Sequence, residues 1–211
     1  DLKYVSIKYK AFPLYSLPAD FLAVFTRELP ILMLSSYYGA SIVGYYVLTK
    51  NTLNAPINLL STSILEVFKQ KAIEDFNEKG NCTDIFLSTL KKLILVAILP
   101  FSLLYFCAPF LFSFFFLQEW EVAGVYAKIL MIMYFFKFIT SPLTYVFYIR
   151  DKMRLDLILQ IAMLILSVSS IYLGFISESG PEYTLLLYSL SNAMFFLIYL
   201  FISNKLSKGK L

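Results

Sequence analysis

The sequence has 211 residues, of which 59% are hydrophobic and only 15% charged, with a net charge of +4 and no histidine. Soluble domains average about 45–50% apolar and about 25% charged residues, so the composition excludes an ordinary soluble protein. Apolar runs recur along the whole chain, which also excludes a signal peptide placed before a soluble domain.

Six apolar stretches are long enough to cross a bilayer, whose hydrocarbon core of about 30 Å requires about 20 helical residues. They cover residues 11–38, 40–68, 93–117, 122–149, 157–176 and 183–203. None of them alternates as a barrel strand does, and lipid admits only helices and closed barrels. The sequence therefore predicts an all-α integral membrane protein with six transmembrane helices in a single unit, residues 1–211.

The basic residues are concentrated in alternate loops. Before span one, between spans two and three, between spans four and five, and after span six lie Lys3, Lys8, Lys10, Lys69, Lys71, Lys79, Lys91, Lys92, Arg150, Lys152, Arg154, Lys205, Lys208 and Lys210. The opposite turns hold Glu119, Glu121, Glu178 and Glu182 and no basic residue. The positive-inside rule therefore predicts cytoplasmic termini and a multi-pass protein of the cytoplasmic membrane. These cations are topology determinants, so we expect no nucleic-acid partner.

The longest predicted loop, residues 69–92, is expected to be a cytoplasmic amphipathic connector. Apolar residues continue through it at helical spacing, at Phe68, Ala72 and Phe76, with charged residues between them. This pattern favours a second span that extends as a helix at the membrane interface, or as a plain helical connector.

Charged residues interrupt the first two spans near their midpoints. Glu28 lies ten residues from Tyr38, and Lys50 lies ten residues from Ala40. At a rise of ~1.5 Å per residue, both are expected roughly 15 Å deep, at one level of two neighbouring antiparallel helices. Ionisable groups at this depth usually face a protein interior or a watery cavity.

Polar residues form a stripe on each of these helices, because residues four and seven apart share a helical face. The fourth span adds Lys137, which is too deep to reach the interface, whereas Lys128 is near enough to do so. The predicted cavity residues are Asp20, Arg27, Glu28, Lys50, Asn51, Asn54, Asn58 and Lys137. Such a cationic cavity suits an anionic ligand, since arginine grips phosphate with two donors.

The same charges have an alternative interpretation, an ion pair of Glu28 with Lys50 or Arg27 that only holds the helices together. Pro30 and Pro56 lie in the same two helices and predict kinks, either around a binding site or as ordinary curvature.

No catalytic motif is present. Without histidine there is no Ser–His or Cys–His pair, and the sequence has no P-loop, glycine-rich nucleotide turn or cluster of metal-binding carboxylates. We therefore expect a protein that is not an enzyme and that uses no cofactor and no metal.

Five stretches, which together cover about residues 9–150, carry a family resemblance. They are YKAFPLYSLPADFLAVFTRELPILMLSSYYGASIVGYYVLTKNTLNAPINLL, EVFKQKAIEDFN, LKKLILVAILPFSLLYFCAPFLFSFFF, EWEVAGVYAKIL and FITSPLTYVF. In this order they resemble the C-terminal half of Wzx-type polysaccharide (O-antigen) flippases, within the multidrug/oligosaccharidyl-lipid/polysaccharide exporter superfamily.

The resemblance implies one six-helix lobe of a two-lobe transporter, with an N-terminal lobe outside this sequence. It implies that undecaprenyl-diphosphate-linked oligosaccharide is moved across the bacterial cytoplasmic membrane by alternating access. Membrane lipids and the polysaccharide assembly machinery are the other implied partners. The alternatives are a drug or organic-ion antiporter of the superfamily, a membrane polysaccharide polymerase or ligase, and an inactive truncated remnant.

Overall fold

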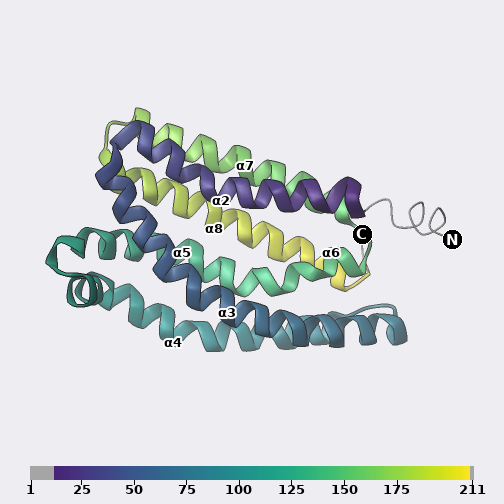
Figure 1. Cartoon of the computed structure of the whole chain (residues 1–211). Coiled ribbons are helices and arrows are strands. Elements are labelled where there is room, and N and C mark those ends of the chain that lie inside the picture. The colour runs from purple at the N-terminus through teal and green to yellow at the C-terminus, as the bar shows by residue number, and fades with distance from the viewer. Residues whose placement is uncertain (1–11, 210–211) are drawn as a thin grey trace.

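The structure is a computed structural model that describes residues 12–209, and this range contains helices and turns but no β-strand. The elements are η1 (Phe12–Ser16), α2 (Leu17–Tyr38), α3 (Ala40–Lys79), α4 (Thr83–Phe116), η2 (Gln118–Trp120), α5 (Glu121–Thr140), η3 (Ser141–Tyr145), α6 (Val146–Ile149), α7 (Met153–Ile176) and α8 (Gly180–Ser207). Successive long helices run in opposite directions, so α2 begins and α8 ends at the same end of the bundle (Figure 1).

Four helical segments of the described chain are long and apolar enough to cross a membrane, which makes this a multi-pass membrane protein. They are Thr83–Phe116, Gln118–Ile149, Met153–Ile176 and Gly180–Ser207. Helices α2 and α3 are long enough, with 22 and 40 residues, but their charged and amide side chains lower their hydropathy. That α2 and α3 also span the membrane, and that the termini are cytoplasmic, stay predictions.

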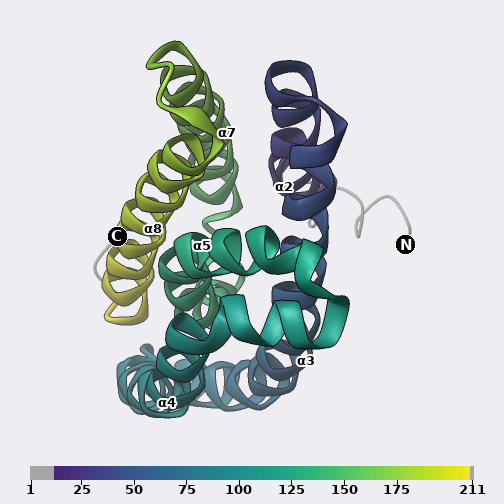
Figure 2. The same cartoon turned by 90° about the vertical axis from the view of Figure 1, so that its left-hand side faces the viewer.

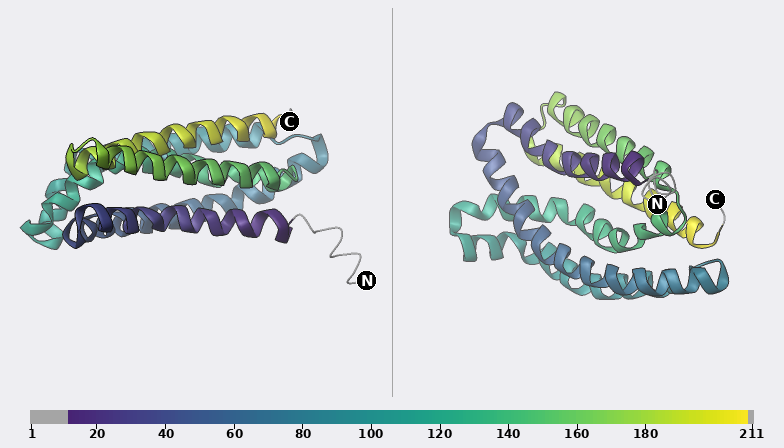
Figure 3. Two further views of the ribbon diagram at one scale, coloured as in Figure 1. Left: turned by 90° about the horizontal axis from the view of Figure 1, so that it is seen from above. Right: turned by 45° about the vertical axis from the view of Figure 1, so that its right-hand side comes forward.

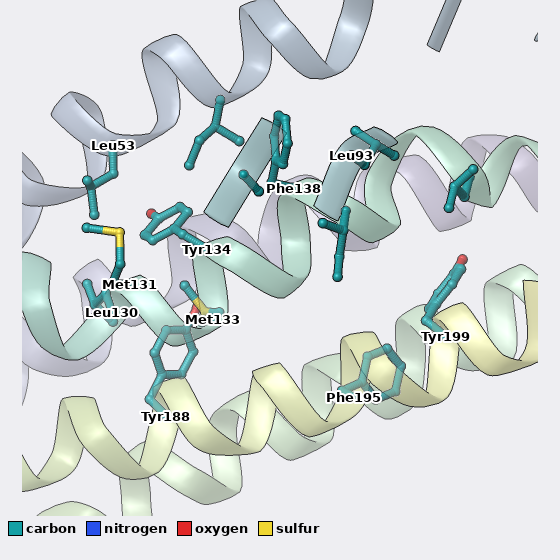
Figure 4. Close-up of a cluster of buried hydrophobic side chains, with 14 of the residues drawn as sticks. Leu53, Leu93, Leu130, Met131, Met133, Tyr134, Phe138, Tyr188, Phe195 and Tyr199 are labelled. Atoms are coloured by element: carbon teal, nitrogen blue, oxygen red, sulfur yellow. The ribbon is translucent and has the colours of Figure 1, made fainter. Parts of the chain in front are cut away.

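Helix α5 forms the centre of the bundle and packs against α3, α4 and α8, while α7 packs against α8 and α2 (Figures 2 and 3). In the most apolar 18 residues of the segment that includes α5, 56% are buried, against 22% in the corresponding part of α4. Figure 4 shows the core around Tyr134 and Phe138 of α5, with Leu53 of α3, Leu93 of α4 and Tyr188 of α8. Helix α4 is therefore peripheral, and α5 carries the core.

Glycine allows two of these helix pairs to approach closely. A Cβ atom added to Gly124 would lie 2.4 Å from the Cα atom of Pro109, and one added to Gly174 would lie 2.6 Å from the Cα atom of Thr184. Small residues serve close helix packing inside membranes, where lipid provides no hydrophobic driving force between helices. Gly124 therefore fixes the α4–α5 contact and Gly174 the α7–α8 contact.

Most of the predicted 69–92 loop is helical. Helix α3 continues to Lys79, Gly80 ends it with a left-handed backbone (φ 72°), and α4 begins at Thr83. The amide of Cys82 donates a hydrogen bond to the carbonyl of Ser207 at 3.0 Å, which ties this turn to the end of α8. The turn is thus part of the bundle, and its cytoplasmic position stays a prediction.

Prolines affect the helices in two ways. The predicted span 122–149 is not one α-helix: α5 ends at Thr140 and the 3-10 turn η3, which contains Pro142, follows it. Proline lacks an N–H donor, and its ring crowds the preceding turn, which explains why the regular α-helical hydrogen bonding stops here. Helices α2 and α3 continue through Pro30 and Pro56, and Figure 1 shows α3 changing direction along its length.

Candidate functional site: a cationic cavity among five helices

A cavity of about 320 Å³ lies between α2, α3, α5, α7 and α8. Its polar lining comprises Asp20, Thr26, Arg27, Tyr46, Lys50, Tyr134, Lys137, Gln160 and Tyr188. The structure thus brings Asp20, Arg27, Lys50 and Lys137 together, four of the residues that the sequence indicated. Three of these four are cations, so the cavity has a positive character.

Glu28 stands at the edge of this cavity and pairs with two of its cations. Its Oε2 atom lies 2.5 Å from the Nζ atom of Lys50, and its Oε1 atom lies 3.4 Å from the Nε atom of Arg27. The Lys50 side chain is 9% exposed, whereas those of Glu28 and Arg27 are 47% and 48% exposed. One carboxylate is thus shared between a buried ammonium and a half-exposed guanidinium.

Lys137 is held by an amide instead of a carboxylate. Its Nζ atom donates a hydrogen bond to Oδ1 of Asn54 at 2.8 Å, and the Asn54 Nδ2 atom donates to the Tyr134 hydroxyl at 3.0 Å. None of the ion pairs in the described part of the chain includes Lys137. No carboxylate of the described chain therefore lies within ion-pair distance of Lys137, although its position is fixed.

Thr26 is a cavity residue that the sequence did not single out. It is 3% exposed, it lines the cavity, and its Oγ1 atom is buried with no hydrogen-bond partner in the described structure. Buried hydroxyl groups nearly always have a partner, and an exception calls for an explanation. A ligand in the cavity would supply the missing partner.

A second chamber of about 180 Å³ adjoins the cavity on the side toward the start of α2. The two spaces share Asp20, Lys137, Gln160, Met163 and Phe196. The chamber adds Asp156 and Tyr199, and the Tyr199 hydroxyl donates a hydrogen bond to Oδ1 of Asp156. The sequence did not indicate Asp156, because it lies one residue before the predicted apolar span and so seemed part of a loop. Its place directly before an apolar run was the available signal.

Four of the predicted cavity residues do not line the cavity. Glu28 and Asn54 contact cations that line it, whereas Asn51 and Asn58 lie away from it. Asn51 and Asn58 are exposed on α3 and are absent from the lining of both spaces. At 3.6 residues per turn, both are rotated by roughly 80–100° from Lys50, far enough to face away. Lys128 is also exposed and lies over the Tyr105 ring, 5.1 Å from its centre.

Helices α2 and α3 expose charged and amide side chains among apolar ones such as Phe21 (69%) and Leu59 (73%). Asp20, Arg27, Asn51 and Asn58 are exposed on these two helices, and Glu28 is half-buried. By contrast, α4 exposes large apolar side chains such as Phe106 (78%), Leu99 (76%) and Phe114 (71%). The surface formed by Asp20, Arg27, Glu28, Asn51 and Asn58, called here the polar face, therefore differs in character from the apolar surface of α4.

The side chains around the cavity are charged groups and hydrogen-bond donors and acceptors that can bind a polar ligand. No group of three or more His, Cys, Asp or Glu residues in the described chain is placed to hold a metal ion. The cations, hydroxyls and amides are donors and acceptors fixed by neighbouring helices, an arrangement that suits a polar ligand with negative charge.

Comparison with known proteins gives one family. A family model described as "Polysaccharide biosynthesis protein" matches residues 5–125. This range includes all of α2, α3 and α4, and hence Arg27, Lys50 and Asn54. No curated protein and no solved structure gives a significant match.

Proposed function

The chain belongs to the polysaccharide biosynthesis protein family, and we propose that it serves to move lipid-linked oligosaccharides across the cytoplasmic membrane of bacteria. The proposed substrate is a sugar repeat unit joined through a diphosphate to undecaprenol, as the resemblance to Wzx-type flippases suggests. The protein would act as a transporter, without enzymatic chemistry.

The observation that carries this proposal is the excess of positive charge in the cavity. Arg27, Lys50 and Lys137 stand against two carboxylates, Asp20 and Glu28. A diphosphate brings the negative charge that Lys137 lacks, and it brings acceptor oxygens for the unpartnered Thr26 hydroxyl. Charge-assisted hydrogen bonds of this kind are roughly twice as strong as neutral ones.

Glu28 suits a transport cycle in which the substrate has to leave. While the cavity is empty, Glu28 neutralises Lys50 and partly Arg27, so that Lys50 is not left as an unpaired buried charge, which would be strongly destabilising. A diphosphate entering between Arg27 and Lys137 would take over the pairing, and Glu28 would resume it on release. Exchange of one anion for another keeps the difference in free energy between the loaded and empty states small.

The charged side chains of the polar face are a reason to propose that a partner covers it. Charged side chains that face lipid at the bilayer centre are costly and rare, and Arg27 and Glu28 are half exposed. We propose that a second six-helix lobe, the N-terminal lobe that the resemblance implies, lies against α2 and α3. Arg27 and Glu28, which border the cavity, would then face the second lobe, and the site would open to either side of the membrane by alternating access.

The other candidate functions have less support. A drug or organic-cation antiporter would require a cavity with an excess of carboxylates, whereas cations are in excess here. A polymerase or ligase would require loops that carry catalytic groups, whereas the turns after α2, α4 and α7 are only a few residues long.

The proposal is tested by complementation of a flippase-null strain with the full-length gene. We expect Arg27→Gln and Lys50→Gln to abolish surface polysaccharide while membrane levels of the protein stay normal. Lys128→Gln is the matched control, because Lys128 is a cation of α5 that lies outside the cavity. Normal polysaccharide in both cavity variants would overturn the proposal.

A further inference from the structure

We propose that the smaller chamber binds a neutral, hydroxyl-rich sugar, namely the sugar attached directly to the diphosphate, and that it disfavours a sugar bearing a carboxylate. The inference rests on the proposed function and adds a selectivity to it. The chamber adjoins the cationic cavity, and its lining includes Asp156, Asp20, Gln160 and Tyr199.

The cavity and the chamber are continuous with each other. Asp20, Lys137 and Gln160 line both the cavity and the chamber, so a group bonded to a phosphate near Lys137 extends directly into the chamber. The two volumes, about 320 and 180 Å³, together fall within the roughly 300–1,000 Å³ of small-molecule sites. The space suits one sugar beside a diphosphate.

Three hydroxyl groups and a carboxylate of the chamber can accept hydrogen bonds from a ligand. The Tyr199 hydroxyl hydrogen is used on Asp156, that of Thr140 on the Phe196 carbonyl, and that of Thr144 on the Ser141 carbonyl. These hydroxyls can therefore offer only oxygen lone pairs to a ligand. A carboxylate has about four acceptor sites, so Asp156 keeps several after accepting from Tyr199. A ligand rich in O–H donors matches this wall.

The chamber contains two carboxylates, Asp156 and Asp20, and one cation, Lys137. Asp156 is 7% exposed, and no ion pair of the described chain involves it. A sugar carboxylate placed here would meet like charges in a setting with little water, which is unfavourable. A neutral sugar meets no such penalty.

Met163 and Phe196 border both spaces and provide apolar surface for the C–H face of a sugar ring. A few placed polar groups on an otherwise apolar wall are typical of selective small-molecule sites. The chamber therefore has both elements that recognition of a sugar requires.

The test measures binding to the purified full-length protein in nanodiscs with three probes. These are a prenyl diphosphate, the same lipid carrying one neutral hexose, and the same lipid carrying one hexuronic acid. We expect the hexose form to bind roughly tenfold more tightly than the bare lipid, the gain from one or two hydrogen bonds. The hexuronic acid form should bind no more tightly than the bare lipid.

Variants assign the selectivity to the chamber. Asp156→Asn keeps an acceptor for Tyr199 and removes the charge, so it should bring the affinity for the hexuronic acid form close to that for the hexose form. Thr144→Val removes a hydroxyl oxygen from the chamber at a position that does not line the cavity, so it should weaken binding of the hexose form severalfold and leave the bare lipid unaffected. Ser169→Ala is the control, because Ser169 is exposed on the same helix as Asp156, α7.

The binding results distinguish failure of the sugar chamber from failure of the proposed function. Equal affinity for the hexose form and the bare lipid, or tighter binding of the hexuronic acid form, would overturn the sugar chamber while leaving the proposed transport of diphosphate-linked lipids intact. Binding of the hexose form without binding of the bare lipid would support the chamber and contradict the role of the cations. Absence of binding by all three probes would overturn both proposals.

Discussion

Lys137 on α5 donates a hydrogen bond to Asn54 on α3 over 2.8 Å, which places an ammonium group at the cavity with an amide as its partner. The Asn54 side chain donates in turn to Tyr134 at 3.0 Å and to the Lys50 carbonyl at 2.9 Å. One amide thus joins two helices and orients a charge. Asn54 therefore differs from Asn51 and Asn58 of the same helix in that its side chain forms hydrogen bonds inside the bundle.

Asn54→Ala should lower the free energy of unfolding by about 1–3 kcal/mol, because it leaves polar groups of Lys137 and Tyr134 without a partner inside the bundle. Asn51→Ala and Asn58→Ala should change it by less than about 0.5 kcal/mol when this lobe is unfolded alone, since both side chains lie on its surface. Thermal unfolding in one detergent compares the three variants. Equal losses in all three would contradict the assignment.

Glu28→Gln should destabilise the protein more than Arg27→Gln. Removal of Glu28 leaves Lys50, which is 7% exposed, as an uncompensated buried charge, whereas Arg27 is half exposed to solvent. The expected loss is below the about 3–5 kcal/mol of a fully buried pair, because Glu28 itself is partly exposed.

The exchange Glu28→Lys with Lys50→Glu tests direct pairing. Each single change places like charges together, and the double variant restores opposite charges, so it should recover part of the lost stability. Unfolding temperatures of the two singles and the double complete the cycle. A double variant no more stable than the worse single would show that the two residues do not interact.

Gly124→Ala should destabilise the protein by about 1–3 kcal/mol, because the new Cβ atom would lie 2.4 Å from the backbone of Pro109 and force α4 and α5 apart. Gly44→Ala is the matched control within α3, where an added Cβ atom meets nothing within 4 Å. That change should be neutral or stabilise by about 0.5–1 kcal/mol, as expected for alanine replacing glycine in a helix. Unfolding temperatures of both variants decide the point.

Cys82 should react slowly with maleimide at neutral pH. Burial raises the pKa of its thiol from 9.0 to about 11, so the reactive thiolate is scarce below that pH. In a Cys107→Ser background, the labelling rate followed by mass spectrometry should rise until about pH 11. A plateau at pH 9 would contradict the shift.

The same pKa shift links Cys82 to stability. The folded protein holds the thiol proton more tightly than the unfolded chain, so this contribution is complete below pH 9 and is lost as the pH rises toward 11. The stability of Cys82→Ala should therefore depend less on pH between pH 9 and 11 than that of the parent. Identical pH dependence would show that Cys82 makes no such contribution.

The sequence predicted well those features that depend on distance along one helix. The rise per residue placed Glu28 and Lys50 at one level, and their side chains are 2.5 Å apart. Such features need no knowledge of how distant helices pack.

Features that depend on packing between helices were harder to predict. Asn51 and Asn58 seemed to belong to the Lys50 stripe, but their rotation of roughly 80–100° around α3 takes them out of the cavity. Thr26 and Asp156 belong to the site because α7 and α8 pack beside α2, an arrangement that the sequence of one helix does not reveal. The break at Ser141 arises because Pro142 ends the regular hydrogen bonding of α5.

The most direct test of the cationic cavity is transfer between leaflets. The full-length protein is reconstituted in proteoliposomes with a fluorescent prenyl-diphosphate-linked sugar, and the rate of its appearance in the opposite leaflet is measured. The account predicts that Arg27→Gln slows transfer at least about tenfold, the effect of losing one charge-assisted contact, while Lys128→Gln leaves the rate unchanged. Equal rates for Arg27→Gln and the parent protein would contradict it.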